Sequence, residues 1–194
     1  MPVAVEVPGL DAYVAAVPDG RIVLLEGGLA PAKSSLARRL GRTAAAAGRP
    51  TLLLTTRGAE ASLEVEGLSV QAVDTWPTAW PDDQDLVVDS FSLLALGSAP
   101  TVLAGRLRNL REACIRQGRI AVLVLDDGHL DVAARAVCHH LADGVIQFLS
   151  RDDSEGLVSY LRIPKWMDGG AFDRNLFYGF TGRQILIDTR RRVT

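Results

Sequence analysis

The sequence predicts an α/β fold in which helices cover both faces of a central, mostly parallel sheet, with an antiparallel extension toward the C-terminus. Short, continuously apolar segments alternate with longer segments of helical periodicity, which is typical of a parallel sheet buried on both sides. In the last quarter of the chain, strand-like segments are separated only by turns, which indicates antiparallel pairing. With 194 residues and 48% hydrophobic side chains, we expect one domain over residues 1–194.

Each element can be assigned from its pattern. The expected core strands of the parallel sheet are Arg21–Glu26, Thr51–Thr56, Asp85–Asp89 and Ile120–Leu125. A shorter strand is expected at Leu68–Val73. Helices are predicted at Lys33–Ala47, which Gly48 closes, at Pro100–Gln117 and at His129–Leu141. The antiparallel extension should consist of Gly144–Leu149, Leu157–Ile163, Asn175–Phe180 and Gln184–Asp188.

Charge and composition narrow the function classes. The formal net charge is −2 and the pI is about 5.9, so no global basic field would attract nucleic acid. Cys114 and Cys138 lack the spacing of metal or redox sites, which predicts two buried, reduced thiols. No secretory signal begins the sequence and no apolar run reaches membrane-spanning length, so we expect a cytoplasmic protein without a membrane partner.

The segment Glu26–Ser35, E-G-G-L-A-P-A-K-S-S, lies between an expected strand and an expected helix, where a phosphate-binding loop belongs. The usual pattern is G-x-x-x-x-G-K-[ST]. Backbone N–H groups and the helix N-terminus wrap the phosphates, the lysine pairs with their oxygens, and the hydroxyl holds Mg²⁺. The candidate nucleotide-binding residues are Gly27, Gly28, Ala32, Lys33, Ser34 and Ser35.

This loop departs from the pattern in its small residues. Ala30 and Ala32 carry a Cβ where glycine would let the backbone approach a phosphate, and Pro31 removes an N–H donor. Two interpretations stay open. The loop is a weakened nucleotide site, or it is a relic in which Lys33 persists through packing.

The surrounding segments resemble the KaiC-like branch of the RecA/RadA superfamily. Val7–Gly20 contains the P-G-L-D segment and a P-x-G turn that precede the first strand in that family, and Leu86–Ser90 (LVVDS) is similar to its Walker B strand. Leu141–Ile146 is similar to the start of the strand near the adenine. Tyr160–Lys165 is similar to the strand ending in a K-x-R element, and Arg183–Asp188 to the closing strand.

The resemblance runs nearly end to end and implies a RecA-like P-loop fold, ATP and Mg²⁺ as ligands, and subunits packed in rings or filaments. It assigns Lys33 to the phosphates, Ser34 and Asp89 to the Mg²⁺ side, and Lys165 to the γ-phosphate of a neighbouring subunit.

Other departures from the family concern catalysis. Where it has water-activating glutamates, the second core strand ends in Thr55-Thr56-Arg57, and Glu60 and Glu64 fall later, in what we expect to be a helix. The K-x-R element is reduced to Lys165-Trp166-Met167, without its arginine. Because hydrolysis depends on positioning and electrostatic stabilisation, these losses favour a pseudo-ATPase with a degenerate Walker A loop.

Asp126 and Asp127, which end the most apolar strand, form an alternative Walker B pair with Asp127 as a base. Strand order and the family resemblance favour Asp89, and Asp126–Asp127 would then be sensor-position or turn residues at the sheet edge where ligands gather. His129, His139 and His140 show no zinc spacing.

Several aromatic and basic residues have a second interpretation besides binding. We expect Trp76–Trp80 to pack a loop against its own core and Arg190–Arg192 to be a solvated end. For Trp166, a surface that contacts a neighbouring subunit and a place folded back onto the C-terminal strands are equally compatible with the sequence.

The function that agrees with all of these features is a KaiC-like, RecA-fold regulatory or accessory subunit with weakened or lost ATP binding and hydrolysis. It would act through a homo-oligomer or with a RecA-family paralogue. The alternatives are an active cytosolic ATPase and a recombinase-paralogue module in DNA repair. A nucleic-acid partner has little support, because Asp127–Leu141, the region that would face DNA, is acidic rather than basic.

Overall fold

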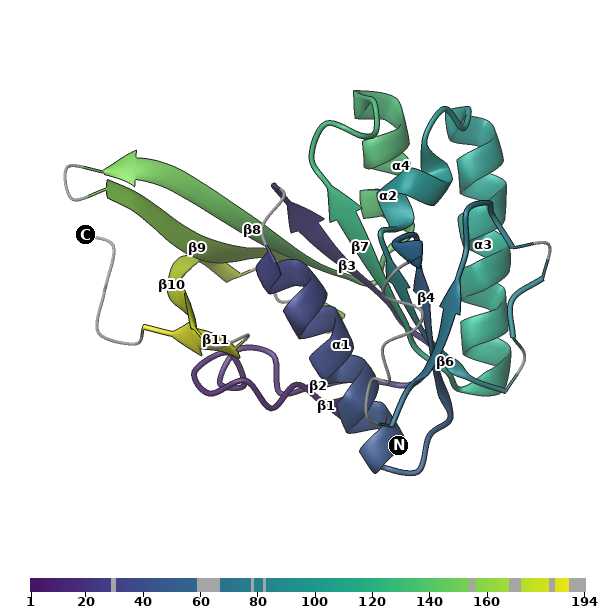
Figure 1. The fold of residues 1–194 in the computed structure, drawn as a ribbon, viewed down its shortest axis with the longest axis horizontal. Coiled ribbons are helices and arrows are strands. Elements are labelled where there is room, and N and C mark those ends of the chain that lie inside the picture. Colours follow the sequence, from purple (N-terminus) through teal and green to yellow (C-terminus); the bar gives the residue numbers. More distant parts are fainter. Residues whose placement is uncertain are drawn as a thin grey trace.

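In the computed structural model, the described residues are 1–28, 31–58, 67–77, 79–81, 83–153, 156–167, 172–181 and 184–188. They form a nine-stranded sheet in the order β11-β10-β9-β8-β3-β7-β6-β4-β5 and a separate pair of short strands, β1 and β2 (Figure 1). The strands are β1 (Val3–Ala4), β2 (Ala16–Val17), β3 (Ile22–Gly27), β4 (Thr51–Thr55), β5 (Ser69–Ala72), β6 (Asp85–Asp89), β7 (Ala121–Asp126), β8 (Gly144–Asp153), β9 (Gly156–Lys165), β10 (Phe172–Thr181) and β11 (Gln184–Ile187). The helices are α1 (Pro31–Ala46), α2 (Phe91–Ala95), α3 (Pro100–Gln117) and α4 (Val132–Leu141).

The six strands β3 to β8 pair in parallel, and β9, β10 and β11 extend the sheet antiparallel from β8. β3 lies at the centre between β7 and β8, in a register that sets Gly27 opposite Asp126 and Phe148. The carboxyl ends of β3 and β7 therefore meet at one edge of the sheet, where parallel sheets of this kind collect ligands.

Helices cover both faces, because the strands are apolar on both sides. Helix α1 packs Leu36 and Leu40 on a cluster that includes Val23 and Leu25 of β3. On the opposite face, α2, α3 and α4 cover a second cluster that includes Leu24 of β3 (Figure 1). The mixed α/β fold and mostly parallel sheet predicted from the sequence are confirmed, as are the four predicted core strands.

Several element boundaries differ from the predictions. Helix α4 begins at Val132 rather than at His129, because Asp131 caps it by accepting a hydrogen bond from the N–H of Ala134 at 2.7 Å. Strands β8 and β9 form a longer hairpin than predicted, and the short helix α2 was missed. Glu60 and Glu64, expected in a helix, lie outside the described residues.

Several side chains that had two interpretations are buried or partly buried in the fold. Trp166 is 8% exposed and belongs to the α1-side cluster, so it folds back onto the sheet and does not form a free surface. Trp76 packs edge-to-face on Phe91 with ring centroids 5.5 Å apart, which confirms that its loop covers the core. Cys114 and Cys138 are free and buried as predicted, and burial raises the pKa of each thiol to about 12. No helix in the described part of the chain is long and apolar enough to cross a membrane.

Candidate nucleotide site at the carboxyl edge of the sheet

The loop between β3 and α1 begins at a glycine whose backbone and surroundings disfavour a side chain. Gly27 has φ of +147°, and an added Cβ would lie 2.1 Å from the carbonyl oxygen of Phe148 on the neighbouring strand β8. Helix α1 starts at Pro31, a favourable first position because the missing N–H would have no partner within the helix. Ala30 lies outside the described residues.

Lys33, in the first turn of α1, is folded back over this loop. Its ammonium donates to the carbonyl oxygens of Gly27, at 2.9 Å, and of Gly28, and it lies 3.2 Å from the carboxylate of Asp126 at the end of β7. Its side chain is only 1% exposed. Two of the three N–H groups of the ammonium are therefore donated to carbonyls, and the carboxylate of Asp126 compensates its charge.

Asp126 is held in place by a buried chain of hydroxyl groups. Its second carboxylate oxygen accepts a hydrogen bond from the hydroxyl of Ser90 at 2.7 Å, and Ser90 contacts the hydroxyl of Ser92 at 2.7 Å. Ser92 also accepts the backbone N–H of Asp126 at 3.1 Å and contacts Nδ1 of His129 at 3.0 Å. The chain therefore joins the loop lysine to a histidine that lies before α4.

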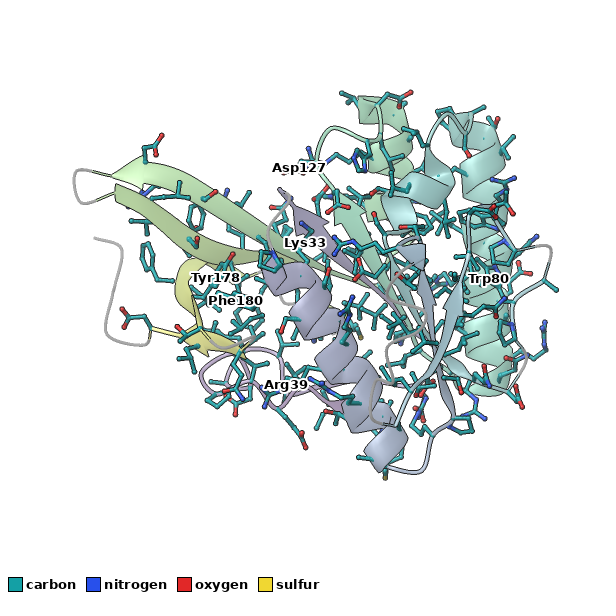
Figure 2. The ribbon with its side chains drawn as sticks, in the orientation of Figure 1. Lys33, Arg39, Trp80, Asp127, Tyr178 and Phe180 are labelled. Atoms are coloured by element: carbon teal, nitrogen blue, oxygen red, sulfur yellow. The ribbon has the colours of Figure 1, made fainter. Side chains whose placement is uncertain are left out.

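The other predicted site residues lie at the same edge. Asp127 is exposed, and its backbone N–H donates to the carbonyl of Gly27 at 3.0 Å; Figure 2 shows Asp127 above Lys33 at this edge of the sheet. Asp89 ends β6 and lies 3.5 Å from the guanidinium of Arg38, which is one helical turn beyond Ser34 on α1. Asp89 therefore faces the side of α1 that carries Ser34.

Ser34 and Ser35 are half-buried in the first turns of α1, whereas Gly28 is exposed. Ala32 is 1% exposed and belongs to the α1-side hydrophobic cluster. Its methyl group therefore packs into the core, and the expected effect of this Cβ on the approach of a phosphate stays a prediction.

A buried glutamate lies directly before the loop. Glu26 is 1% exposed and receives hydrogen bonds from Arg135 at 2.5 Å, from His139 at 2.8 Å and from Gln147 at 3.1 Å. Burial alone would raise the pKa of Glu26, but the hydrogen bonds from these side chains outweigh it and lower the pKa to about 2. The cluster binds α4 to β3, so the loop starts from a strand end that is fixed from the α4 side.

Lys165 lies at the other edge of the sheet. It ends β9 opposite Val145, close to the amino end of the parallel strands. Its ammonium donates to the carbonyl oxygens of His139, His140 and Ala142, at 3.2, 3.1 and 2.5 Å, where α4 ends. The structure does not bring Lys165 to the loop of its own chain, and its contact with a neighbouring subunit stays a prediction.

Sequence reasoning missed the roles of Glu26, Ser90, Ser92 and His129. All of the first three lie at or within three residues of the end of a core strand. Because carboxyl ends of parallel strands share one edge, their positions in the sequence carried a usable signal. His129 could not be found in this way, because its link to Ser92 depends on the path of the turn after β7.

Comparison with known proteins supports the fold. The sequence matches the family of unknown function DUF7125 over residues 32–194, whereas no curated protein matches it. A KaiC-like protein from the hyperthermophilic archaeon Pyrococcus horikoshii OT3 is similar with a TM-score of 0.72 and 18% identity, covering 97% of this chain and 99% of that one. The flagellar accessory protein FlaH from Methanocaldococcus jannaschii is similar with a TM-score of 0.73 and 14% identity, covering 96% and 98%. At these identities the similarity confirms the predicted RecA-like fold.

Proposed function

We propose that this chain, which belongs to the family of unknown function DUF7125, is a RecA-fold regulatory or accessory subunit with weakened or lost ATP binding and hydrolysis. In this proposal it acts by assembling with itself or with a RecA-family paralogue. Its similarity to a KaiC-like protein and to a flagellar accessory protein is compatible with such a role.

The observation that carries the proposal is the state of Lys33. A triphosphate needs N–H donors and positive charge from this lysine, but its ammonium already donates to the carbonyls of Gly27 and Gly28, and Asp126 neutralises its charge. To bind phosphate, Lys33 would have to exchange a carboxylate and two carbonyls for phosphate oxygens. The binding free energy would then contain only the difference between the phosphate contacts and the contacts that Lys33 gives up. The affinity for ATP is weakened for this reason.

The residues that would hold ATP and Mg²⁺ are Gly27, Gly28, Lys33, Ser34 and Asp89. With Lys33 closed, this set does not fit a triphosphate, because the ammonium is bound to the carbonyls of Gly27 and Gly28 and its charge is compensated by Asp126. The loop would accept the ligand only after Lys33 leaves Asp126.

The strand end that should carry a water-activating acid also lacks one. β4 ends at Thr55, and the hydroxyl of Thr56 accepts the backbone N–H of Ser90 at 3.2 Å, so this position joins two strand ends. General acid–base catalysis contributes about 10²–10⁴-fold in rate, which this position would forgo.

An active ATPase is the second candidate, and Asp127 is the observation that favours it. Its carboxylate is exposed and its backbone is bonded to the loop glycine Gly27, so an acid is available beside the phosphate site. In that case Asp127 would act as the base.

Titration calorimetry with ATP and Mg²⁺, together with phosphate release, tests both candidates. We expect weak or undetectable binding and phosphate release near background. Robust phosphate release that disappears in Lys33→Ala and in Asp127→Asn would overturn the proposal in favour of the ATPase.

Light scattering over a range of concentrations tests the assembly. We expect the scattering mass to rise with concentration or on adding a RecA-family paralogue, and a strictly monomeric chain under both conditions contradicts this part. Retention on single-stranded DNA that falls as salt rises would instead favour the recombinase module.

A further inference from the structure

We propose that His129, acting through Ser92 and Ser90, positions Asp126 as the counter-ion of Lys33 and thereby keeps the phosphate loop closed. This makes His129 a positioning residue, since no atom of it contacts Lys33. The consequence for nucleotide binding rests on the proposed function; the positioning itself does not.

The direction of each hydrogen bond follows from counting protons. The carboxylate of Asp126 only accepts, so the hydroxyl proton of Ser90 is donated to it. Ser90 then has no proton left, so Ser92 must donate to Ser90 across their 2.7 Å contact. Ser92 in turn has no proton for His129, so the 3.0 Å contact requires a proton on Nδ1 of His129.

All side-chain hydrogen bonds in this series therefore point toward the carboxylate of Asp126. Ser92 donates once and accepts twice, from His129 and from the backbone N–H of Asp126, which satisfies its hydroxyl completely. Asp126 receives Ser90 on one oxygen and faces Lys33 with the other. The carboxylate is thus fixed from the side opposite to the lysine, and a chain polarised in one direction strengthens each of its bonds.

Because the two serines are buried, His129 is the member of this hydrogen-bonded series that a partner can reach. Ser90 is 2% exposed and Ser92 0%, so water cannot replace a missing partner inside the chain. His129 is half-exposed, on the turn between β7 and the Asp131 cap of α4. A partner that moves this turn would remove the donor of Ser92, free the hydroxyl of Ser92 to rotate, and loosen Asp126 and then Lys33.

The protein sequence contains only two lysines, Lys33 and Lys165, which makes a direct test feasible. The folded protein is treated with an amine-acetylating reagent, and the acetylation rate of each lysine is followed by peptide mass spectrometry. His129→Leu removes the donor, and His129→Asn supplies a side-chain N–H close to the place of Nδ1. Ser92→Ala breaks the chain in the core, and His140→Leu is a control at an exposed histidine.

We expect His129→Leu and Ser92→Ala to raise the acetylation rate of Lys33 about tenfold, as loss of one network hydrogen bond implies for local opening. His129→Asn and His140→Leu should behave like the wild type. Lys165 should keep its rate in every variant, which separates local opening from unfolding. Unchanged protection of Lys33 in both His129→Leu and Ser92→Ala overturns the positioning role.

Binding of a fluorescent ATP analogue to the same variants separates this inference from the proposed function. Faster acetylation of Lys33 together with tighter nucleotide binding supports both the positioning role and the proposed function. Faster acetylation of Lys33 without tighter nucleotide binding supports the positioning role and overturns the view that the closed lysine weakens the nucleotide site.

Discussion

The ammonium of Lys33 and the carboxylate of Asp126 lie 3.2 Å apart, and both side chains are almost fully withdrawn from water. A buried ion pair contributes little net stability, but removing one partner leaves an uncompensated charge. The same pairing therefore has two measurable consequences, one for folding stability and one for access of an anion to the loop.

Asp126→Asn should loosen Lys33 without changing the shape of the site. We expect it to lower the free energy of unfolding by about 3 kcal/mol, because the buried ammonium loses its counter-ion. Binding of ATP should tighten by about tenfold, which corresponds to roughly 1.4 kcal/mol. Urea denaturation and calorimetry measure the two effects, and Glu112→Gln, at an exposed position on α3 outside the site, is the control that should change neither.

Ala32→Gly separates the alanine from the lysine as the cause of weak binding. From the sequence alone, glycine at positions 30 and 32 should strengthen ATP binding by restoring close backbone approach. Because Ala32 is buried in the first turn of α1, we now expect Ala32→Gly to destabilise the fold by about 1 kcal/mol and to leave affinity unchanged. Tighter ATP binding by this variant in calorimetry would show that the methyl group limits the site.

The sheet could be predicted from the sequence because its strands are continuous apolar runs. Ile120–Leu125 and Asp85–Asp89 can only be strands buried on both faces, and the structure has β7 and β6 there. Local pattern was insufficient for α2, which has five residues and too few turns for a periodic signal. The length of the hairpin β8–β9 was also missed, since half-exposed strands lack a continuous apolar run.

The sequence predicts where the candidate site lies, but not which groups the ammonium of Lys33 contacts there. A Lys-Ser pair after a strand and a loop places the lysine at the start of a helix, and Lys33 lies there. Whether its ammonium faces a ligand or Asp126 depends on how β3 and β7 pair. Local sequence patterns do not predict the pairing of two strands that are nearly one hundred residues apart. The buried place of Trp166 likewise depends on a tertiary contact, with Gly144.

Glu26→Gln should remove a pH-dependent part of the stability. The pKa of Glu26 falls from 4.5 to about 2 on folding, so the unfolded state binds more protons between these values. The contribution is therefore complete above about pH 4.5 and is lost as the pH falls toward 2. We expect the variant to be less stable by about 2 kcal/mol at pH 7, because Arg135 is partly exposed and the pair is screened.

The measurement is urea denaturation of both proteins from pH 7 to pH 2.5. The difference between wild type and Glu26→Gln should shrink as the pH falls, whereas Glu112→Gln, at an exposed position on α3, should show no difference. A difference that is constant with pH contradicts the lowered pKa.

Lys165→Met tests whether this lysine caps a helix or serves a neighbouring subunit. The ammonium satisfies carbonyls at the end of α4, so we expect a loss of about 1 kcal/mol in the free energy of unfolding while the aliphatic stem is kept. Denaturation of the isolated chain measures this. An unchanged stability combined with altered phosphate release in an assembled sample would instead favour the contact with a neighbouring phosphate.

Trp166→Ala tests the place of the indole in the core. Trp166 is 8% exposed, and truncating a buried tryptophan costs about 3–5 kcal/mol, so we expect a large fall in the urea midpoint. Gly144→Ala perturbs the same contact, since its Cβ would lie 2.8 Å from the Trp166 ring. Overpacking of this kind lowers stability by about 1–3 kcal/mol.

The two changes share one contact, so their effects should not add. In Gly144→Ala with Trp166→Ala, the smaller side chain leaves room for the new methyl group, and the double variant should lose less stability than the sum of the single variants. Light scattering on the folded single variants should give the wild-type mass at each concentration, because a buried indole is not available to a partner. Additive losses together with a lower scattering mass would place Trp166 in a subunit interface instead.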